Sequence, residues 1–283
     1  MFGWFKPTCP CDPAAKRWVE DRLRWLSRQF GLHILLERPI ILPAEEFFPD
    51  PYDQSPRSVR VLFCRVCKYM EVDPNSVDIK LVNDQTPRWM SELDPTRGFA
   101  AGTWESGGQP WETRHSRMEP DEDDEDESPG PGPRGKGLIR IERGSLDRPS
   151  DLIGIMAHEL AHQRLLGEGR ARADAFDNEL LTDLTVVYHG FGIFLANNPR
   201  KSTGELGYWP GTKLYRPEYL SEPMLGYALA HIAWFRDEER PAWAQHLRWT
   251  PRSVFKEGLR YLLKTADSTF QPVRLRLLRE EDD

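Results

Sequence analysis

The stretch MAHELAHQRLLGEG, residues 156–169, decides both the fold and the function that we predict for this chain. It contains His158, Glu159 and His162. On an α-helix, residues four apart lie one turn apart on the same face, so the two imidazoles can converge on one metal ion. Neutral imidazoles are good zinc ligands, and Glu159 projects beside the position of a metal-bound water. Two histidines do not complete a zinc site, so a third ligand must come from elsewhere.

The best candidate for that ligand lies in DNELLTDL, residues 177–184. We expect a helix over about 172–196, antiparallel to the first. Glu179 would then lie about seven residues, or roughly 10 Å, into this helix and level with His162. Asp183 lies one turn further on, and a carboxylate there can accept the free N–H of a ligating histidine and orient its ring.

The two motifs together carry a family resemblance. His-Glu-x-x-His at 158–162 and Asn-Glu-x-x-x-Asp at 178–183 resemble the gluzincin, or thermolysin-like, zinc metallopeptidases. The resemblance covers only about 30 of the 283 residues, and the whole chain is also similar to bacterial proteins with this motif. It implies Zn²⁺ as the cofactor, Glu159 as the general base, Asp183 as the outer partner, and three metal ligands: His158, His162 and Glu179.

Other interpretations of the same residues stay open. Glu168 lies six residues after His162, as the third ligand does in metzincins, but those enzymes have glycine where this chain has Leu165. Asp174 and Asp177 can instead favour the positive end of the following helix. The last alternative is a helix without metal, although a mostly apolar helix has little reason to bury two histidines and a glutamate unless something pairs them.

Peptide hydrolysis needs one more donor, for the oxyanion of the tetrahedral intermediate, and such enzymes often supply a His or Tyr from their C-terminal part. Tyr227 and His231 share a face of a later helix, and we predict them as catalytic candidates for this role. The alternative is a core tyrosine beside a hydrogen-bonded core histidine. Tyr208 and Tyr215 are further candidates, whereas Tyr188 is expected to point away from the metal.

Hydrophobic periodicity and turn residues predict an α+β fold that is mainly helical, with a small sheet. We expect helices at about residues 13–30, 57–71, 150–166, 172–196, 219–236 and 251–265. We expect strands within residues 33–43, 77–82, 98–104 and 137–144. By the resemblance, GLIRIERG at 137–144 is the edge strand that aligns an extended substrate by backbone pairing; the alternative is a plain sheet strand.

Residues 105–137 differ in composition from the rest of the chain. They are rich in Gly and Pro and include the acidic run DEDDEDE at 121–127, so they cannot bury enough surface to fold alone. We predict a disordered surface loop, with a partner-binding tail as the alternative. It separates a small α+β region, 1–104, from a helical metallopeptidase-like region, 138–283. If the strands on either side pair, the loop is an excursion from a hairpin and does not separate domains.

The charge balance and the N-terminus limit the partners. Lys plus Arg number 38 against 45 Asp plus Glu, and the net charge of -7 gives no support to a nucleic-acid partner, since phosphate contacts need a concentrated basic surface. The N-terminus lacks the apolar region of a signal peptide, and no stretch approaches the length of a membrane span. We therefore expect a cytoplasmic location, a peptide or protein substrate, and neither nucleic acid nor membrane as a partner; the oligomeric state stays open.

Four cysteines form two close pairs, Cys9 with Cys11 and Cys64 with Cys67. Without a secretion signal, a disulfide framework is not expected. Zinc sites usually present Cys-x-x-Cys on a tight turn, whereas Cys64 and Cys67 lie in a predicted helix. We therefore expect buried thiols, with a four-thiolate structural zinc as the alternative.

These patterns predict a zinc metallopeptidase with Glu159 as general base. Two other functions remain open: a regulatory protease that cleaves one partner protein, and a non-catalytic binding protein that zinc stabilises. The intact Glu159 argues against the second of these, because a purely structural zinc has no use for a base and usually closes its fourth position.

Overall fold

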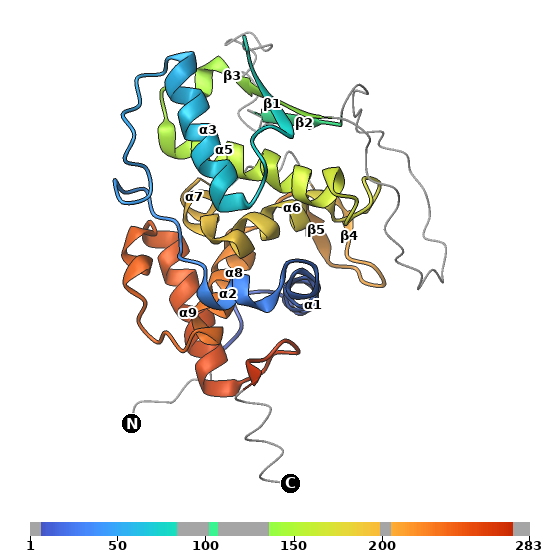
Figure 1. Cartoon of the computed structure of the whole chain (residues 1–283). Coiled ribbons are helices and arrows are strands. Elements are labelled where there is room, and N and C mark those ends of the chain that lie inside the picture. Colours follow the sequence, from blue (N-terminus) through green and yellow to red (C-terminus); the bar gives the residue numbers. More distant parts are fainter. Residues whose placement is uncertain (1–6, 84–101, 107–135, 199–204, 274–283) are drawn as a thin grey trace, which may run out of the picture. The chain divides into compact units, whose positions relative to one another are not determined.

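The computed structural model describes residues 7–83, 102–106, 136–198 and 205–273 (Figure 1). These residues form two compact units. The sheet unit consists of residues 52–83, 102–106 and 136–178, and the helical unit of residues 7–51, 179–198 and 205–273. The described residues are mostly helical with small sheets, which confirms the predicted α+β class.

The sheet unit contains a three-stranded sheet and two long helices. Its elements are α3 (Pro56–Met70), β1 (Val77–Val82), β2 (Gly102–Glu105), β3 (Gly137–Glu142), a 3₁₀ turn (Arg143–Ser145), α5 (Pro149–His162) and the π-helical turn Gln163–Gly167. The strand order is β1-β3-β2, with β1 parallel and β2 antiparallel to β3. α5 packs against α3 and β2, so the helix that carries both histidines is central to this unit (Figure 1).

The position of β3 corrects one prediction and confirms another. Residues 137–144 were predicted as an edge strand, but β3 pairs with a strand on each side, so its backbone cannot align a substrate. Its side chains alternate between buried and half-buried, with Ile139 and Ile141 fully buried, as in an interior strand. β2 and β3, which precede and follow the acidic segment in the sequence, pair with each other, as the sequence analysis considered. Most of residues 105–137 lies outside the described residues, so the disordered loop and the domain division stay predictions.

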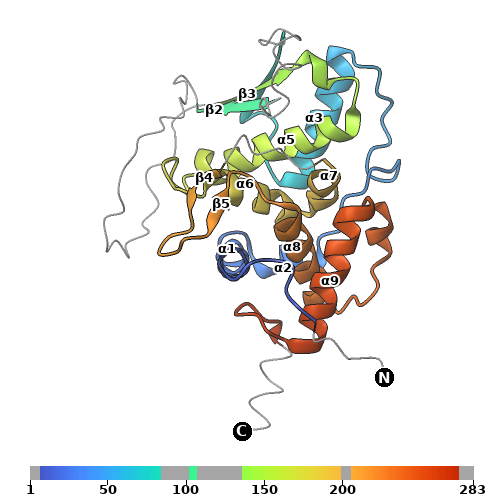
Figure 2. The same ribbon diagram turned by 180° about the vertical axis from the view of Figure 1, so that it is seen from behind.

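The helical unit is built around α8. Its elements are α1 (Pro13–Phe30), α2 (Leu32–Glu37), α6 (Asn178–Val186), the π-helical turn Val187–Phe191, α7 (Gly192–Asn197), β4 (Glu205–Tyr208), β5 (Tyr215–Pro217), α8 (Glu222–Phe235), the 3₁₀ turn Ala242–His246 and α9 (Trp249–Thr265). α8 packs against α9, α1 and α7 (Figure 2). α1 begins where predicted, because the Asp12 carboxylate accepts the N–H groups of Ala14 and Ala15, and it ends at Gly31.

Two local predictions in the helical unit were wrong. Residues 33–43 were predicted as a strand, but Leu32–Glu37 form α2, since short apolar runs do not distinguish helix from strand. The helix ends before Pro39, and Arg38 has the extended backbone that a following proline favours. Likewise, no strand was predicted within residues 205–217, yet they contain the antiparallel pair β4 and β5.

Among the described residues, the run Asn178–Asn197 is the helical stretch that is both long and apolar enough to cross a membrane. It spans 20 residues with a mean hydropathy of 1.2, so by length and composition it could cross a membrane, contrary to the expectation that no stretch could. However, 94% of the tested window is buried inside the protein, as in the core helix of a globular fold. Gly190, with φ 92°, interrupts its regular helical backbone. The expectation that no membrane partner exists stays a prediction.

Gly190 provides a test of this kink. A Cβ atom on Gly190 would lie 2.7 Å from the Pro39 carbonyl oxygen, and the Gly190 oxygen accepts the N–H of Ile41. We expect Gly190→Ala to lower the free energy of unfolding by about 2 kcal/mol or more, from backbone strain plus the clash. Gly211 is the matched control, because its φ is 69° but nothing lies within 4 Å of an added Cβ. Gly211→Ala should lose only about 1 kcal/mol in urea unfolding; equal losses would contradict the packing at Gly190.

Candidate metal centre

The candidate centre begins in α5, a helix that is buried on almost every side. Pro149 starts the helix in its first turn, and apolar residues such as Met156 fill most positions that face the neighbouring elements. Within this apolar helix His158, Glu159 and His162 are 1%, 2% and 8% exposed. The two imidazole rings lie edge to face with their centroids 4.8 Å apart. Burying three such groups is unfavourable unless each is paired, so this helix places an unusual concentration of polar side chains inside the protein.

A π-helical turn fixes the end of this helix directly after His162. The N–H of Glu168 donates to the carbonyl of Gln163, five residues earlier, at 3.0 Å. The Gln163 amide oxygen accepts the indole N–H of Trp104 at 2.9 Å, which ties the turn to β2. Single π turns of this kind are frequent next to functional sites. The turn therefore holds His162 between a rigid helix and the sheet.

The start of α6 differs from the prediction. We expected the helix to begin near Arg172, but it begins at Asn178, so Glu179 is its second residue and not about its seventh. Arg172 instead pairs with Asp174 across a turn, with N–O distances of 3.1 and 2.9 Å. Asp177, which directly precedes the helix, is a residue type that is preferred at such starts. The geometric reason for choosing Glu179 was therefore wrong, although the residue still meets the criteria for a ligand.

The ligand atoms of His158, His162 and Glu179 all lie within 4.8 Å of one another. Among the described residues this is the group of His, Cys, Asp and Glu side chains that could hold a metal ion. Zinc with nitrogen and oxygen ligands at about 2.0–2.2 Å needs ligand atoms roughly 3.4 Å apart, so shifts of about 1 Å would suffice. Two imidazoles and one carboxylate also form the ligand set of several catalytic zinc sites. The three side chains therefore fit zinc, and the zinc itself stays a prediction.

Asp183 lies one turn after Glu179 and is 3% exposed. Its Oδ2 accepts the backbone N–H of Leu220 at 3.1 Å, which ties α6 to the segment before α8. A carboxylate held in this way has little freedom to rotate. The proposed bond from Asp183 to a ligating histidine stays a prediction.

The rival carboxylates have other partners. Glu168 accepts from Arg170 at 2.7 Å and forms an ion pair with Arg164 at 3.3 Å, while Asp174 pairs with Arg172. Neither belongs to the ligand cluster. These bonds engage Glu168 and Asp174 in local turns, so they favour Glu179 over Glu168 as the third ligand.

Tyr227 and His231, predicted as candidates for the oxyanion donor, occupy the core of the helical unit. Both side chains are 0% exposed. The Tyr227 hydroxyl donates to Glu20 at 2.7 Å, and the two ring nitrogens of His231 lie 3.1 Å from the Tyr227 carbonyl and 3.0 Å from the Ser268 hydroxyl. This is the alternative of a core tyrosine and a hydrogen-bonded core histidine. Because their polar atoms are occupied and buried, we assign neither a catalytic role.

Glu20 is the centre of this buried network. It is 0% exposed, and it accepts the N–H and hydroxyl of Thr269 besides forming an ion pair with Lys16 at 3.0 Å. Burial opposes ionisation of Glu20, but these hydrogen bonds outweigh it and hold its pKa below the usual value. Burial also lowers the pKa of His231 to about 4, so this imidazole is neutral near pH 7. The network holds the segment after α9 against α1 and α8.

The other tyrosines considered for the oxyanion differ in exposure. Tyr208 and Tyr215 are 54% and 53% exposed and stack across the β4–β5 hairpin with ring centroids 4.7 Å apart. They remain accessible candidates for substrate contact. Tyr188 is buried and donates its hydroxyl to the Gly31 carbonyl at 2.9 Å.

The cysteines are free thiols in the structure. Cys9 and Cys11 belong to the helical unit, and Cys64 and Cys67 lie in α3 of the sheet unit. Burial raises the pKa of the Cys67 thiol to about 12, so at pH 7 this group is protonated and unreactive. The expected buried thiols agree with Cys11 and Cys67, whereas Cys9 and Cys64 are half-buried. The alternative of a four-thiolate zinc stays untested.

In comparisons with protein-family models, with curated proteins and with solved structures, nothing matches this chain. The resemblance to gluzincins therefore rests on the two motifs alone.

The ligand cluster predicts metal binding with defined variants. We expect the purified protein to hold about one zinc per chain by elemental analysis. Glu179→Ala should weaken zinc binding by more than about 100-fold, because even outer-shell changes cost 10–100-fold. Glu168→Ala, the matched control at the rival carboxylate, should leave it unchanged. Loss of zinc in Glu168→Ala and not in Glu179→Ala would contradict this assignment and identify Glu168 as the third ligand.

The His231 network predicts how stability depends on pH. In the unfolded chain, His231 binds a proton below about pH 6.5. In the folded protein its pKa is about 4, so it stays neutral until the pH is much lower. Stability from this residue is therefore complete above about pH 6.5 and falls as the pH drops toward 4, by about 2–3 kcal/mol. The lowered pKa of Glu20 acts in the same direction at still lower pH.

Urea unfolding at pH 7 and 4.5, with a chelator present so that metal release does not contribute, measures this effect. His231→Gln should reduce the pH dependence by that amount, even if the variant is less stable at pH 7. An unchanged pH dependence would show that His231 is not buried in its neutral form.

Proposed function

We propose that this protein is a zinc-dependent metallopeptidase related in its active-site design to the gluzincins. The observation that carries the proposal is the group of three ligand atoms, from His158, His162 and Glu179, within 4.8 Å of one another and directly beside Glu159. A structural zinc usually has four protein ligands, whereas three ligands next to a carboxylate are typical of a catalytic zinc. The donor set, the buried base and the sequence motif all support the same chemistry.

Zinc held by these three side chains would supply a Lewis acid that lowers the pKa of water and polarises a carbonyl. Glu159 then acts as general base: its carboxylate accepts the proton of the attacking water and delivers it to the nitrogen of the leaving amine. Its 2% exposure keeps bulk water away from this proton. Asp183 holds its place through Leu220 and would orient a ligand on the same side.

β2 is a better candidate than β3 for aligning a peptide. It packs against α5 and, in the part of the chain that the structure describes, pairs with β3 along one edge. A second edge can add an extended peptide as a further strand, which fixes its direction through main-chain hydrogen bonds. We therefore propose that β2, residues 102–105, aligns the substrate in place of the strand at residues 137–144.

Replacing Glu159 by Gln tests the mechanism, because it removes the base while it keeps the size of the side chain. We expect Glu159→Gln to keep zinc and the unfolding midpoint and to lose about 10²–10⁴-fold in activity. Since the substrate is not specified, the measurement compares new protein N-termini in cells that express wild type or Glu159→Gln. Glu168→Gln is the control with an equal charge change.

The outcomes separate the possible functions. Many wild-type-specific N-termini support a general peptidase, and a single one supports a regulatory protease with one partner. Equal cleavage by wild type and Glu159→Gln would exclude Glu159 as the base. Zinc bound without any cleavage would instead identify a zinc-stabilised binding protein.

A further inference from the structure

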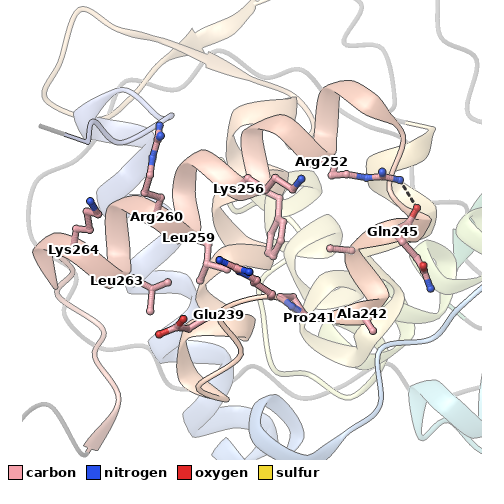
Figure 3. A pocket seen from close by; sticks show the side chains of 13 residues that line it. Glu239, Pro241, Ala242, Gln245, Arg252, Lys256, Leu259, Arg260, Leu263 and Lys264 are labelled. Carbon is pink, nitrogen blue, oxygen red and sulfur yellow. Dashed lines mark hydrogen bonds between the residues drawn. The ribbon is translucent and has the colours of Figure 1, made fainter. Parts of the chain in front are cut away.

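A second site candidate lies entirely within the helical unit and does not depend on the metal centre. The outer face of α9 and the turn before it enclose a groove of about 680 Å³ (Figure 3). One wall is α9 from Arg252 to Lys264, and the other is formed by residues 239–245. The twelve helical steps from Arg252 to Lys264 correspond to about 18 Å, so the groove has the length of a short peptide segment.

The groove has an apolar floor. Phe255 and Leu259 form its bottom and are 2% and 4% exposed, and Trp243 packs against Phe255 with ring centroids 4.9 Å apart. Leu263 also lines the groove but is 40% exposed, and Pro241 and Ala242 face it from the other wall (Figure 3). A groove with such a floor favours an occupant that has apolar side chains of its own.

Its rim is strongly basic. Arg252, Lys256, Arg260 and Lys264 recur every four residues along α9, and Arg240 lies on the opposite wall, whereas Glu239 is the one acidic lining residue. Residues four apart on a helix are about 6 Å apart and lie on one face. The stripe therefore presents positive charges at regular intervals along the whole groove. This concentration contrasts with the net charge of -7 of the chain.

The charges differ in what they already contact. Arg252 donates to the carbonyls of Gln245 and Leu247, so it serves to cap the preceding turn. Among the described residues, no carboxylate forms an ion pair with Lys256, Arg260 or Arg240. Three side chains on both walls are thus available to bind an anion.

Trp249 extends the same surface at the first turn of α9. It is 84% exposed, the most exposed of the large apolar side chains that the structure describes. The 100° rotation per residue puts Trp249 on the helical stripe that carries Lys256 and Arg260. Exposed aromatic residues bordered by basic ones are typical of surfaces that bind other proteins.

We propose that this groove binds a short amphipathic peptide segment of a partner protein, one that carries acidic side chains along an apolar stripe. Acidic residues one helical turn apart match the spacing of Lys256 and Arg260, and apolar residues between them would cover Leu263 and the floor. A nucleic-acid backbone would use the cations but not the floor, and a membrane is too flat to fill a groove. Charge and shape together favour the acidic peptide.

A fluorescein-labelled helical peptide of fourteen residues, with leucines on one stripe and glutamates every fourth residue beside it, is the probe. We expect it to bind wild type with a Kd on the order of 10–100 μM, as for small transient contacts. The charge-reversal variant K256E/R260E should weaken binding at least tenfold. Leu263→Ala should weaken it severalfold, and it should fold, since Leu263 is already 40% exposed.

The matched control is R17E/K213E, which makes the same charge change at two exposed residues of the helical unit outside the groove. It should bind the probe like wild type, and urea unfolding should show that both double variants are folded. A probe that does not bind at 500 μM, or that binds K256E/R260E as well as wild type, would overturn the proposal.

Two further results would also overturn it. One is equal binding of a peptide with its leucines replaced by serine, which would mean that charge alone is recognised. The other is that the peptide does not bind, whereas phosphatidylglycerol vesicles or single-stranded DNA bind wild type and not K256E/R260E.

Discussion

The burial of two histidines and a glutamate in one apolar helix is the constraint on which the rest of this structure depends. His158, Glu159 and His162 are each at most 8% exposed, inside a helix that otherwise packs apolar residues on α3 and β2. Polar groups placed in this way destabilise a fold unless they are paired. The ligand atoms of His158, His162 and Glu179 lie within 4.8 Å of one another, and we propose that they bind a cation. The π turn fixes the end of α5 after His162, and the bond to the Leu220 N–H holds the Asp183 carboxylate.

The residues of the candidate site could be predicted because their relation is local. A spacing of four residues on a helix determines that His158 and His162 share a face whatever the tertiary fold. The caps of α1 at Asp12 and Gly31 were predictable for the same reason. By contrast, the start of α6 was placed six residues too early, since helical periodicity continued through a turn that the Arg172–Asp174 pair closes. Boundaries depend on such single contacts more than on periodicity.

The surroundings of residues with distant partners could not be predicted from the sequence. Tyr227 and His231 have the types and spacing of catalytic residues, but the partner of Tyr227 is Glu20, 207 residues away in sequence. Nothing near position 227 indicates that bond. Likewise, whether residues 137–142 form an edge or a central strand depends on β1 and β2 and not on their own alternation. The basic groove could not be predicted, because its two walls come together only when α9 folds against the preceding turn.

The central claim is that zinc is bound by two imidazoles and a carboxylate, and X-ray absorption at the zinc edge of the purified protein tests it most directly. We expect a shell of nitrogen and oxygen neighbours at about 2.0–2.2 Å, with the outer scattering of two imidazole rings. A shell of sulfur at about 2.3 Å would place the zinc on the cysteines, and a protein purified from zinc-replete cells without zinc would contradict the metal centre itself.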